Sequence, residues 1–176
     1  APSKRVLDAD AALALRRRLP SFVQAVGLFV NEDAQRITSV AAQVGLDTIQ
    51  LHGDETPRFA RALGRRYWRA HRIDAGFDLR ARLAAWKGAE FHLLDSASAG
   101  YGGSGHPFDW STVVSAGVDE FDATRLIVAG GLDDGNVGQA IERFRPFAVD
   151  SSSGIQSADP RCKDAIYPTS VAKSDT

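Results

Sequence analysis

The chain alternates six short apolar runs with stretches of helical periodicity, and this alternation limits the fold more than any other feature of the sequence. The apolar runs span residues 26–30, 48–52, 67–73, 91–95, 126–129 and 147–150. Continuous apolar strands separated by helices are typical of a parallel sheet with both faces covered. The sequence therefore predicts an α/β fold with about six parallel strands.

The segments between the strands carry helix signals. Helices are expected over residues 8–19, 31–44, 56–64, 77–86, 109–116 and 135–144. For the second helix, Asn31 is the candidate N-cap, and Glu32 and Asp33 would lie in its first turn. The apolar face of that helix comprises Ile37, Val40, Ala41 and Val44. Gly45 is expected to end it.

Composition indicates one soluble globular domain spanning residues 1–176. Hydrophobic residues make up 44% and charged residues 24% of the chain, and the net charge is -1. This balance gives no reason to expect a nucleic acid or a membrane as partner. The run Arg16, Arg17 and Arg18 is interpreted as cations complementing a helix dipole. The single cysteine, Cys162, and the absence of a long apolar run favour a cytoplasmic location.

A doubly wound open sheet is the alternative α/β architecture. Its dinucleotide-binding version carries a GxGxxG motif in the first turn between strand and helix. No such motif follows any expected strand, and the glycines at 102–105 lie in a longer loop without that spacing. The sequence therefore favours a parallel barrel, with 101–105 as a loop that could close over a ligand.

Polar residues stand where the expected strands end. They are Asn31, His52, Asp95, Gly130, Gly131 and the residues 150–154. In a parallel barrel, the carboxyl ends of the strands gather at one face, which carries the active site. We therefore expect these polar groups to converge on one site.

The last two strands lead into loops of small residues, AGGL at 129–132 and SSSG at 151–154. Glycines let backbone N–H groups approach an anion closely, and serines add hydroxyl donors. Barrels often bind phosphate after their last two strands. A phosphate site is favoured here over simple tight turns.

Asp95 and His52 are the titratable candidates. Asp95 could be a helix cap or a catalytic acid, and burial beside apolar walls would raise the pKa of such a carboxyl. His52 could contact a ligand, carry a proton or be satisfied by its own loop, and its position slightly favours the last.

Several strings, in one order, resemble the phosphoribosylanthranilate isomerase family over about residues 3–164. They are VGLFVN at 26–31, QLHGDE at 50–55, LLDS at 93–96, YGGSG at 101–105 with FDW at 108–110, AGGL at 129–132 with NV at 136–137, and VD at 149–150 with SSG at 152–154. The resemblance implies a (β/α)8 TIM barrel without cofactor or metal. It implies the Amadori rearrangement of N-(5′-phosphoribosyl)anthranilate, a small phosphosugar, in tryptophan biosynthesis.

The resemblance also implies roles for individual residues. Asp95 matches the general acid, and Arg5 matches an arginine that contacts the substrate. His52 and Asp150 match positions that face the pocket. The phosphate site of the family corresponds to Gly130, Gly131, Ser152, Ser153 and Gly154.

One departure from the family concerns its first strand, which reads roughly KICGIT and carries the cysteine general base. That strand, the following helix and the second strand have no counterpart here, so an incomplete barrel of six strands is expected. Cys162 does not match the missing base. We expect these residues alone to be unstable, to self-associate or to be completed by another segment.

Two other functions are considered. An inactive or non-catalytic barrel fragment would bind a phosphate ligand without turnover. Another phosphosugar barrel enzyme, as in indole-glycerol-phosphate synthesis, would call for lysine and glutamate at the strand ends, and these are absent from the expected ends.

Overall fold

The structure is a computed structural model that describes residues 6–74, 77–96 and 125–155. The Gly-rich loop at 101–105, the helix expected at 109–116, Arg5 and Cys162 lie outside these residues. None of the helices in the described part of the chain has the length and apolar character that a membrane crossing requires.

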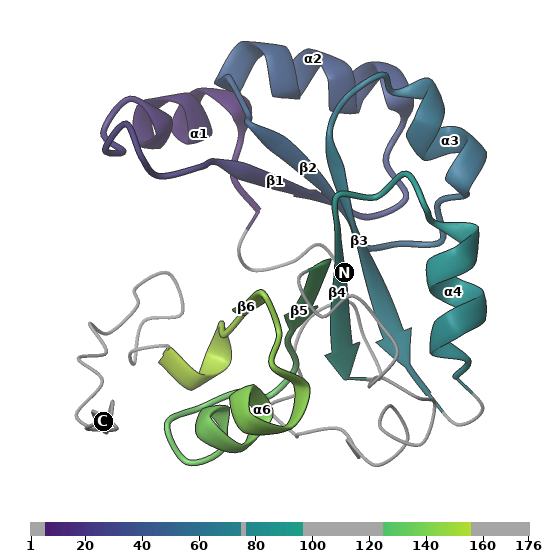
Figure 1. Ribbon diagram of the computed structural model, residues 1–176. Helices are drawn as coiled ribbons and strands as arrows, with labels where there is room; N and C mark the ends of the chain where they lie inside the picture. The colour runs from purple at the N-terminus through teal and green to yellow at the C-terminus, as the bar shows by residue number, and fades with distance from the viewer. Residues whose placement is uncertain (1–5, 75–76, 97–124, 156–176) are drawn as a thin grey trace.

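A six-stranded parallel sheet forms the centre of the described residues. Its strands are β1 (Val26–Phe29), β2 (Thr48–Leu51), β3 (Tyr67–Ile73), β4 (Phe91–Ser96), β5 (Leu126–Val128) and β6 (Ala148–Val149). They pair in sequence order, so β1 and β6 are the edges. The strands form an open arc with the helices outside it (Figure 1). The predicted α/β fold with six parallel strands is confirmed.

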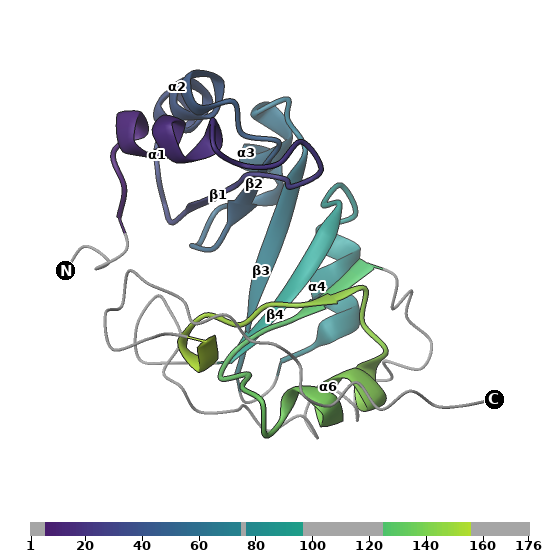
Figure 2. The same cartoon turned by 90° about the vertical axis from the view of Figure 1, so that its left-hand side faces the viewer.

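In the described part of the chain, one helix precedes β1 and the others lie between successive strands, except between β4 and β5. They are α1 (Ala9–Arg16), α2 (Ala34–Val44), α3 (Pro57–Ala62), α4 (Leu79–Ala85) and α6 (Val137–Phe144), with a 3₁₀ turn, η3 (Ser153–Ile155), after β6. Side chains of Asp8, Asp33, Thr56 and Asp78 cap the first four. Viewed from another side, α1 and α2 lie towards one end of the molecule and α6 towards the other (Figure 2).

The N-cap expected for the second helix is wrong by two residues. Asp33 caps α2 by accepting hydrogen bonds from the N–H groups of Gln35 and Arg36. Asn31 instead has a left-handed backbone, with φ of 52°. Its amide holds Asp54 on the next loop, so the chain needs two further residues before the helix begins. Gly45 ends α2 as predicted, with φ of 71°.

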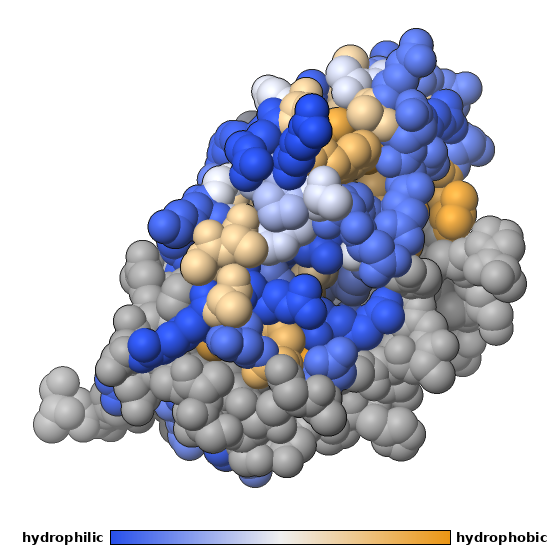
Figure 3. Space-filling model, turned by 90° about the vertical axis from the view of Figure 1, so that its right-hand side faces the viewer, coloured by the Kyte–Doolittle hydropathy of each residue, from blue (hydrophilic) through white to orange (hydrophobic). Residues whose placement is uncertain are grey.

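Most of the core lies between the convex face of the sheet and the helices. One cluster gathers around β2 and α3 and a second around β4, β5, α4 and α6. Ile37, Ala41 and Val44 are buried as predicted, whereas Val40 is half-buried. The outer face that carries α3 and α4 is mostly hydrophilic, with small hydrophobic areas (Figure 3). The helices thus seal one side of the sheet.

The concave face carries a smaller apolar cluster. Its members are Ala70, Leu93, Ile127 and Ala129, with Trp68, Phe91 and Ala148 against them. On the edge strands, Leu28 is 56% exposed and Val149 is 37% exposed. Apolar side chains on unpaired parallel edges are surfaces that further strands usually cover.

Candidate active site

The carboxyl ends of β4, β5 and β6 lie level with one another. Leu94 pairs with Val128, and Val128 pairs with Val149. The N–H of Ala129 donates to Leu94 O at 2.8 Å, and the N–H of Asp150 donates to Val128 O at 2.8 Å. Asp95 therefore lies on the same rim of the sheet as the loops that follow β5 and β6.

Asp95 and Asp150 also share a face of the sheet. Side chains alternate between the two faces along a strand. Leu93 and Ala148 belong to the concave cluster, so the residues two positions further, Asp95 and Asp150, face the same side. With neighbouring strands about 4.8 Å apart, the backbone positions of these two residues are separated by roughly 10 Å across β5.

His52 and Asp95 are paired across the sheet. Nε2 of His52 lies 3.0 Å from Oδ2 of Asp95. The two side chains are 15% and 12% exposed, so water has little access to the contact. His52 follows β2 and Asp95 lies near the end of β4, with β3 between them. The structure thus brings together two residues that the sequence analysis treated separately.

Gln50 completes a buried chain of three polar groups. Its Nε2 lies 3.1 Å from Nδ1 of His52, and the residue is 6% exposed. Gln50 was not among the predicted site residues. The signal was present, because Gln50 is a polar residue within an apolar run and lies two positions before His52, on the same face of β2.

The interpretation of His52 that its position slightly favoured is wrong, and the surroundings of Asp95 are more polar than a wholly apolar pocket. His52 is not satisfied by its own loop, because its partners are Gln50 on β2 and Asp95 on β4. Asp95 is 9% exposed, but it is not enclosed by apolar walls alone, because the imidazole of His52 occupies one side of its carboxyl. The strand register that places these groups together cannot be read from the apolar pattern.

The loop after β5 has the backbone conformation that its glycines allow. Gly130 and Gly131 have φ values of 88° and 67°, which L side chains rarely adopt. The Asn136 amide donates to Gly131 O at 2.9 Å and holds the loop against the start of α6. At these two glycines the loop therefore presents backbone groups at the rim and no side chains.

The loop after β6 packs directly on the loop after β5. Ser151 Oγ donates to Leu132 O at 2.6 Å. A Cβ added at Gly154 would lie 2.1 Å from the same carbonyl oxygen and 2.9 Å from Asp133 Cα. Ser152 is exposed and Ser153 begins η3. The two loops predicted to bind phosphate therefore form one surface.

A charged network braces the rim beside His52. The Glu55 carboxylate accepts from the N–H groups of Asn31 at 2.7 Å and Gly53 at 2.9 Å. Arg69 donates to Glu55 Oε2 and to Gly53 O, both at 2.8 Å, and its guanidinium lies 4.5 Å from the Trp86 ring centre. Burial lowers the pKa of Arg69, and the Glu55 carboxylate opposes that shift.

A buried pair of histidines lies on the opposite, helix-facing side of the sheet. His71 Nε2 lies 3.0 Å from His92 Nδ1, and the rings stack with centres 5.3 Å apart. Burial, followed by His92 and two arginines, lowers the pKa of His71 to about 2. Burial and Arg125 lower the pKa of His92 to about 4. Both rings are therefore neutral at pH 7 and lie outside the concave site.

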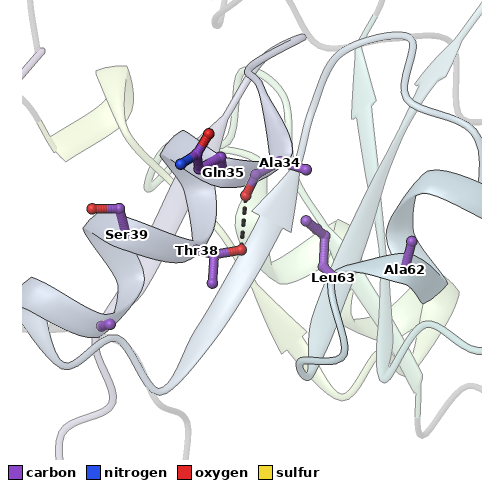
Figure 4. A pocket seen from close by; sticks show the side chains of 7 residues that line it. Ala34, Gln35, Thr38, Ser39, Ala62 and Leu63 are labelled. Atoms are coloured by element: carbon purple, nitrogen blue, oxygen red, sulfur yellow. Dashed lines mark hydrogen bonds between the residues drawn. The ribbon is translucent and has the colours of Figure 1, made fainter.

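Two hollows differ in chemistry. A groove of about 460 Å³ runs between α2 and α3, and no titratable side chain lines it (Figure 4). A smaller hollow of about 180 Å³ opens at the rim beside His52, where Gly53, Arg69 and Arg72 also line it. Only the second borders the residues described above. Within the described ranges, no group of three or more His, Cys, Asp or Glu side chains could hold a metal ion.

The sequence of the chain is similar to that of known proteins. Residues 1–165 match the family model of N-(5'phosphoribosyl)anthranilate (PRA) isomerase. An N-(5'-phosphoribosyl)anthranilate isomerase of Bordetella parapertussis is 48% identical over 169 residues, which cover 93% of this chain and 76% of that protein.

The fold is similar to solved structures of proteins with the same activity in their names. Phosphoribosyl anthranilate isomerase from Thermotoga maritima superposes with a TM-score of 0.80 at 38% identity, over 92% of this chain and 77% of that one. A phosphoribosyl anthranilate isomerase in complex with reduced 1-(o-carboxyphenylamino)-1-deoxyribulose 5-phosphate superposes with a TM-score of 0.76 at 35% identity, over 92% and 76% of the two chains.

Proposed function

This chain belongs to the N-(5′-phosphoribosyl)anthranilate isomerase family, and from that premise we propose that it acts as an isomerase on this substrate in tryptophan biosynthesis. The reaction is an Amadori rearrangement that yields 1-(2-carboxyphenylamino)-1-deoxyribulose 5-phosphate. One observation carries the proposal. A buried carboxyl, Asp95, lies on the same rim of the sheet as the two loops of small residues that follow β5 and β6.

Asp95 is the proposed general acid. It donates a proton to the ring oxygen of the ribose, the bond from that oxygen to C1′ breaks, and the nitrogen lone pair forms the C1′=N bond. Loss of the C2′ proton to a base then gives the enolamine, which tautomerises to the ketone. The near-dry surroundings of Asp95 support this role, because proton transfer is more effective where water does not compete.

The loops after β5 and β6 are the proposed phosphate site. Gly130, Gly131, Ser152, Ser153 and Gly154 supply backbone N–H and hydroxyl donors to the 5′-phosphate. Their direct packing supports this, because a preformed surface orients the substrate without an ordering cost.

Three residues are proposed to hold the rest of the substrate. Asp150 is two strands away from Asp95, with their backbone positions about 10 Å apart, which suits contact with the sugar hydroxyls between the phosphate and the reacting carbon. His52 contacts the substrate beside Asp95. Arg5, outside the described residues, is assigned to the anthranilate carboxylate by its place in the family pattern.

The general base is proposed to come from a segment other than these 176 residues. Two more strands, as in a TIM barrel, would pair with β1 and β6 and cover Leu28 and Val149. Without that segment, the open edges favour self-association. The cytoplasm is the proposed location, since one cysteine leaves no disulfide within these residues.

A fluorescence turnover assay tests the proposal. The chain is assayed on N-(5′-phosphoribosyl)anthranilate, alone and with a peptide that carries the family's opening strand, helix and second strand. We expect turnover only with the peptide. No turnover in either assay, with phosphate binding retained by calorimetry, would contradict the enzyme and favour the non-catalytic barrel. The supporting observation for that barrel is that β1 and β6 are the edges of the sheet within the described residues.

A further inference from the structure

We propose that Gln50 is a positioning residue that fixes the tautomer of His52 and thereby selects which oxygen of Asp95 carries the catalytic proton. This inference rests on the proposed role of Asp95 as general acid. It concerns the buried chain Gln50–His52–Asp95, whose first member is not part of the proposed substrate site.

The contacts define one consistent hydrogen-bond direction. The amide nitrogen of Gln50, which can only donate, lies 3.1 Å from Nδ1 of His52. Nδ1 must then accept, and a neutral imidazole with an accepting Nδ1 carries its proton on Nε2. Nε2 lies 3.0 Å from Oδ2 of Asp95, so it donates to that oxygen.

The direction of this bond decides how Asp95 can act. When Oδ2 receives an N–H from His52, the proton of the acid form resides on Oδ1 and is available to the sugar oxygen. In the other tautomer, Nε2 has a lone pair, and Asp95 would give its proton to His52 instead. Gln50 thus keeps the catalytic proton on the side of the carboxyl that faces away from His52.

Gln50 is held firmly enough for this task. It is 6% exposed and lies in β2, which pairs on both sides, with Leu28 on β1 and Trp68 on β3. The backbone N–H of His52 donates to Phe29 O at 2.9 Å, which fixes the other end of the pair. An amide with a purely structural role would be equally buried, so burial does not distinguish that role from the proposed positioning role. The tautomer of His52 distinguishes them.

Nitrogen-15 NMR of the histidine rings in the peptide-completed chain tests the proposal directly. Spectra are recorded at about pH 8, above the ordinary pKa of an imidazole, and His52→Asn identifies the signals. We expect the wild-type ring to be protonated at Nε2. In Gln50→Glu, a carboxylate accepts from Nδ1 while Asp95 still accepts from Nε2, so the ring should carry a proton on Nδ1 in addition to that on Nε2. Gln50→Leu should give a mixture of the two tautomers.

Thr48→Val is the matched control. Thr48 lies on the same strand and is 3% exposed, and its hydroxyl donates to Arg66 O rather than to His52. It should keep the wild-type tautomer. A wild-type ring protonated at Nδ1, or an unchanged tautomer in both Gln50 variants, would overturn the proposal. A wild-type ring protonated at Nδ1 overturns the proposal even where a variant does not fold.

Kinetics of the peptide-completed enzyme supply the second readout. We expect kcat of Gln50→Leu to fall by about tenfold to a hundredfold with KM changed less than about threefold, because the proton transfer and not substrate binding is affected. A rise in KM alone would contradict the proposed role. If the completed wild type shows the Nε2–H tautomer but no turnover, the proposed function fails, while the inference about Gln50 and His52 stands.

Discussion

Nε2 of His52 lies 3.0 Å from Oδ2 of Asp95, although the two residues are 43 positions apart and β2, which His52 follows, is not a neighbour of β4. The sheet register explains the contact. Leu51, Arg69 and His92 are paired across β2, β3 and β4 and so lie at one level of the sheet. His52 is one residue beyond Leu51, whereas Asp95 is three residues beyond His92. The imidazole reaches diagonally past β3, whose Ala70 side chain is a small residue on the same concave face.

Replacing Gly154 should damage the proposed phosphate site and the fold together. In Gly154→Ala the new Cβ would lie 2.1 Å from Leu132 O, a backbone atom that cannot rotate away. We expect a loss of about 1–3 kcal/mol in the free energy of unfolding, measured by denaturant titration. Binding of inorganic phosphate, measured by calorimetry, should weaken as the two loops separate.

Gly138→Ala is the control for that change. Gly138 lies in α6, and a Cβ there meets no atom within 4 Å. Alanine in a helix should stabilise the protein by about 0.5–1 kcal/mol relative to glycine. Equal stability and equal phosphate affinity in the two variants would mean that the loops do not pack as described.

The strands were the most predictable part of the molecule. β3 (Tyr67–Ile73) has the predicted bounds, because the segment stands between two helical patterns that limit it on both sides. The start of α2 was less predictable. Asn31 and Asp33 can both cap a helix, and the choice depends on the tertiary bond between Asn31 and Asp54.

The candidate site was predictable in position but not in contacts. Residues after parallel strands must share a rim, so Asp95 and the two loops were placed together correctly. The Gln50–His52–Asp95 chain depends on strand register and side-chain reach, which an apolar pattern does not encode. The bracing network around Glu55 was missed for the same reason.

Removing the Glu55 carboxylate should destabilise the rim. In Glu55→Ala, Arg69 and two backbone N–H groups lose their acceptor at a site where the glutamate side chain is 3% exposed. We expect a loss of about 3–5 kcal/mol in the free energy of unfolding, measured by denaturant titration. Glu142→Ala, on the exposed side of α6, should change it by no more than about 0.5 kcal/mol. Equal effects of the two changes would contradict the bracing role.

The buried histidine pair should make the protein sensitive to acid. The folded-state pKa values of His71 and His92, about 2 and about 4, lie below the unfolded value of about 6.5. The unfolded state therefore binds more protons below pH 6.5, and stability should fall as the pH drops from about 6.5 towards 4. The slope is at most about 1.4 kcal/mol per pH unit for each ring.

The double variant His71→Gln, His92→Asn isolates this effect. Its amides can keep a hydrogen bond between the strands but do not titrate. Thermal or urea unfolding between pH 4 and pH 8 should show a shallower acid limb in the double variant than in the wild type, with parallel curves above about pH 7.5. The same slope in both proteins below pH 6.5 would show that the pair does not titrate as described.

The central claim is that this chain supplies the general acid of the isomerase, and Asp95→Asn tests it most directly. In the peptide-completed enzyme, with Glu142→Gln as the control, turnover of N-(5′-phosphoribosyl)anthranilate is followed by fluorescence. The account predicts that Asp95→Asn lowers kcat by about a hundredfold to ten-thousandfold while Glu142→Gln matches the wild type. Turnover by Asp95→Asn at the wild-type rate, or no turnover by the completed wild type, would contradict it.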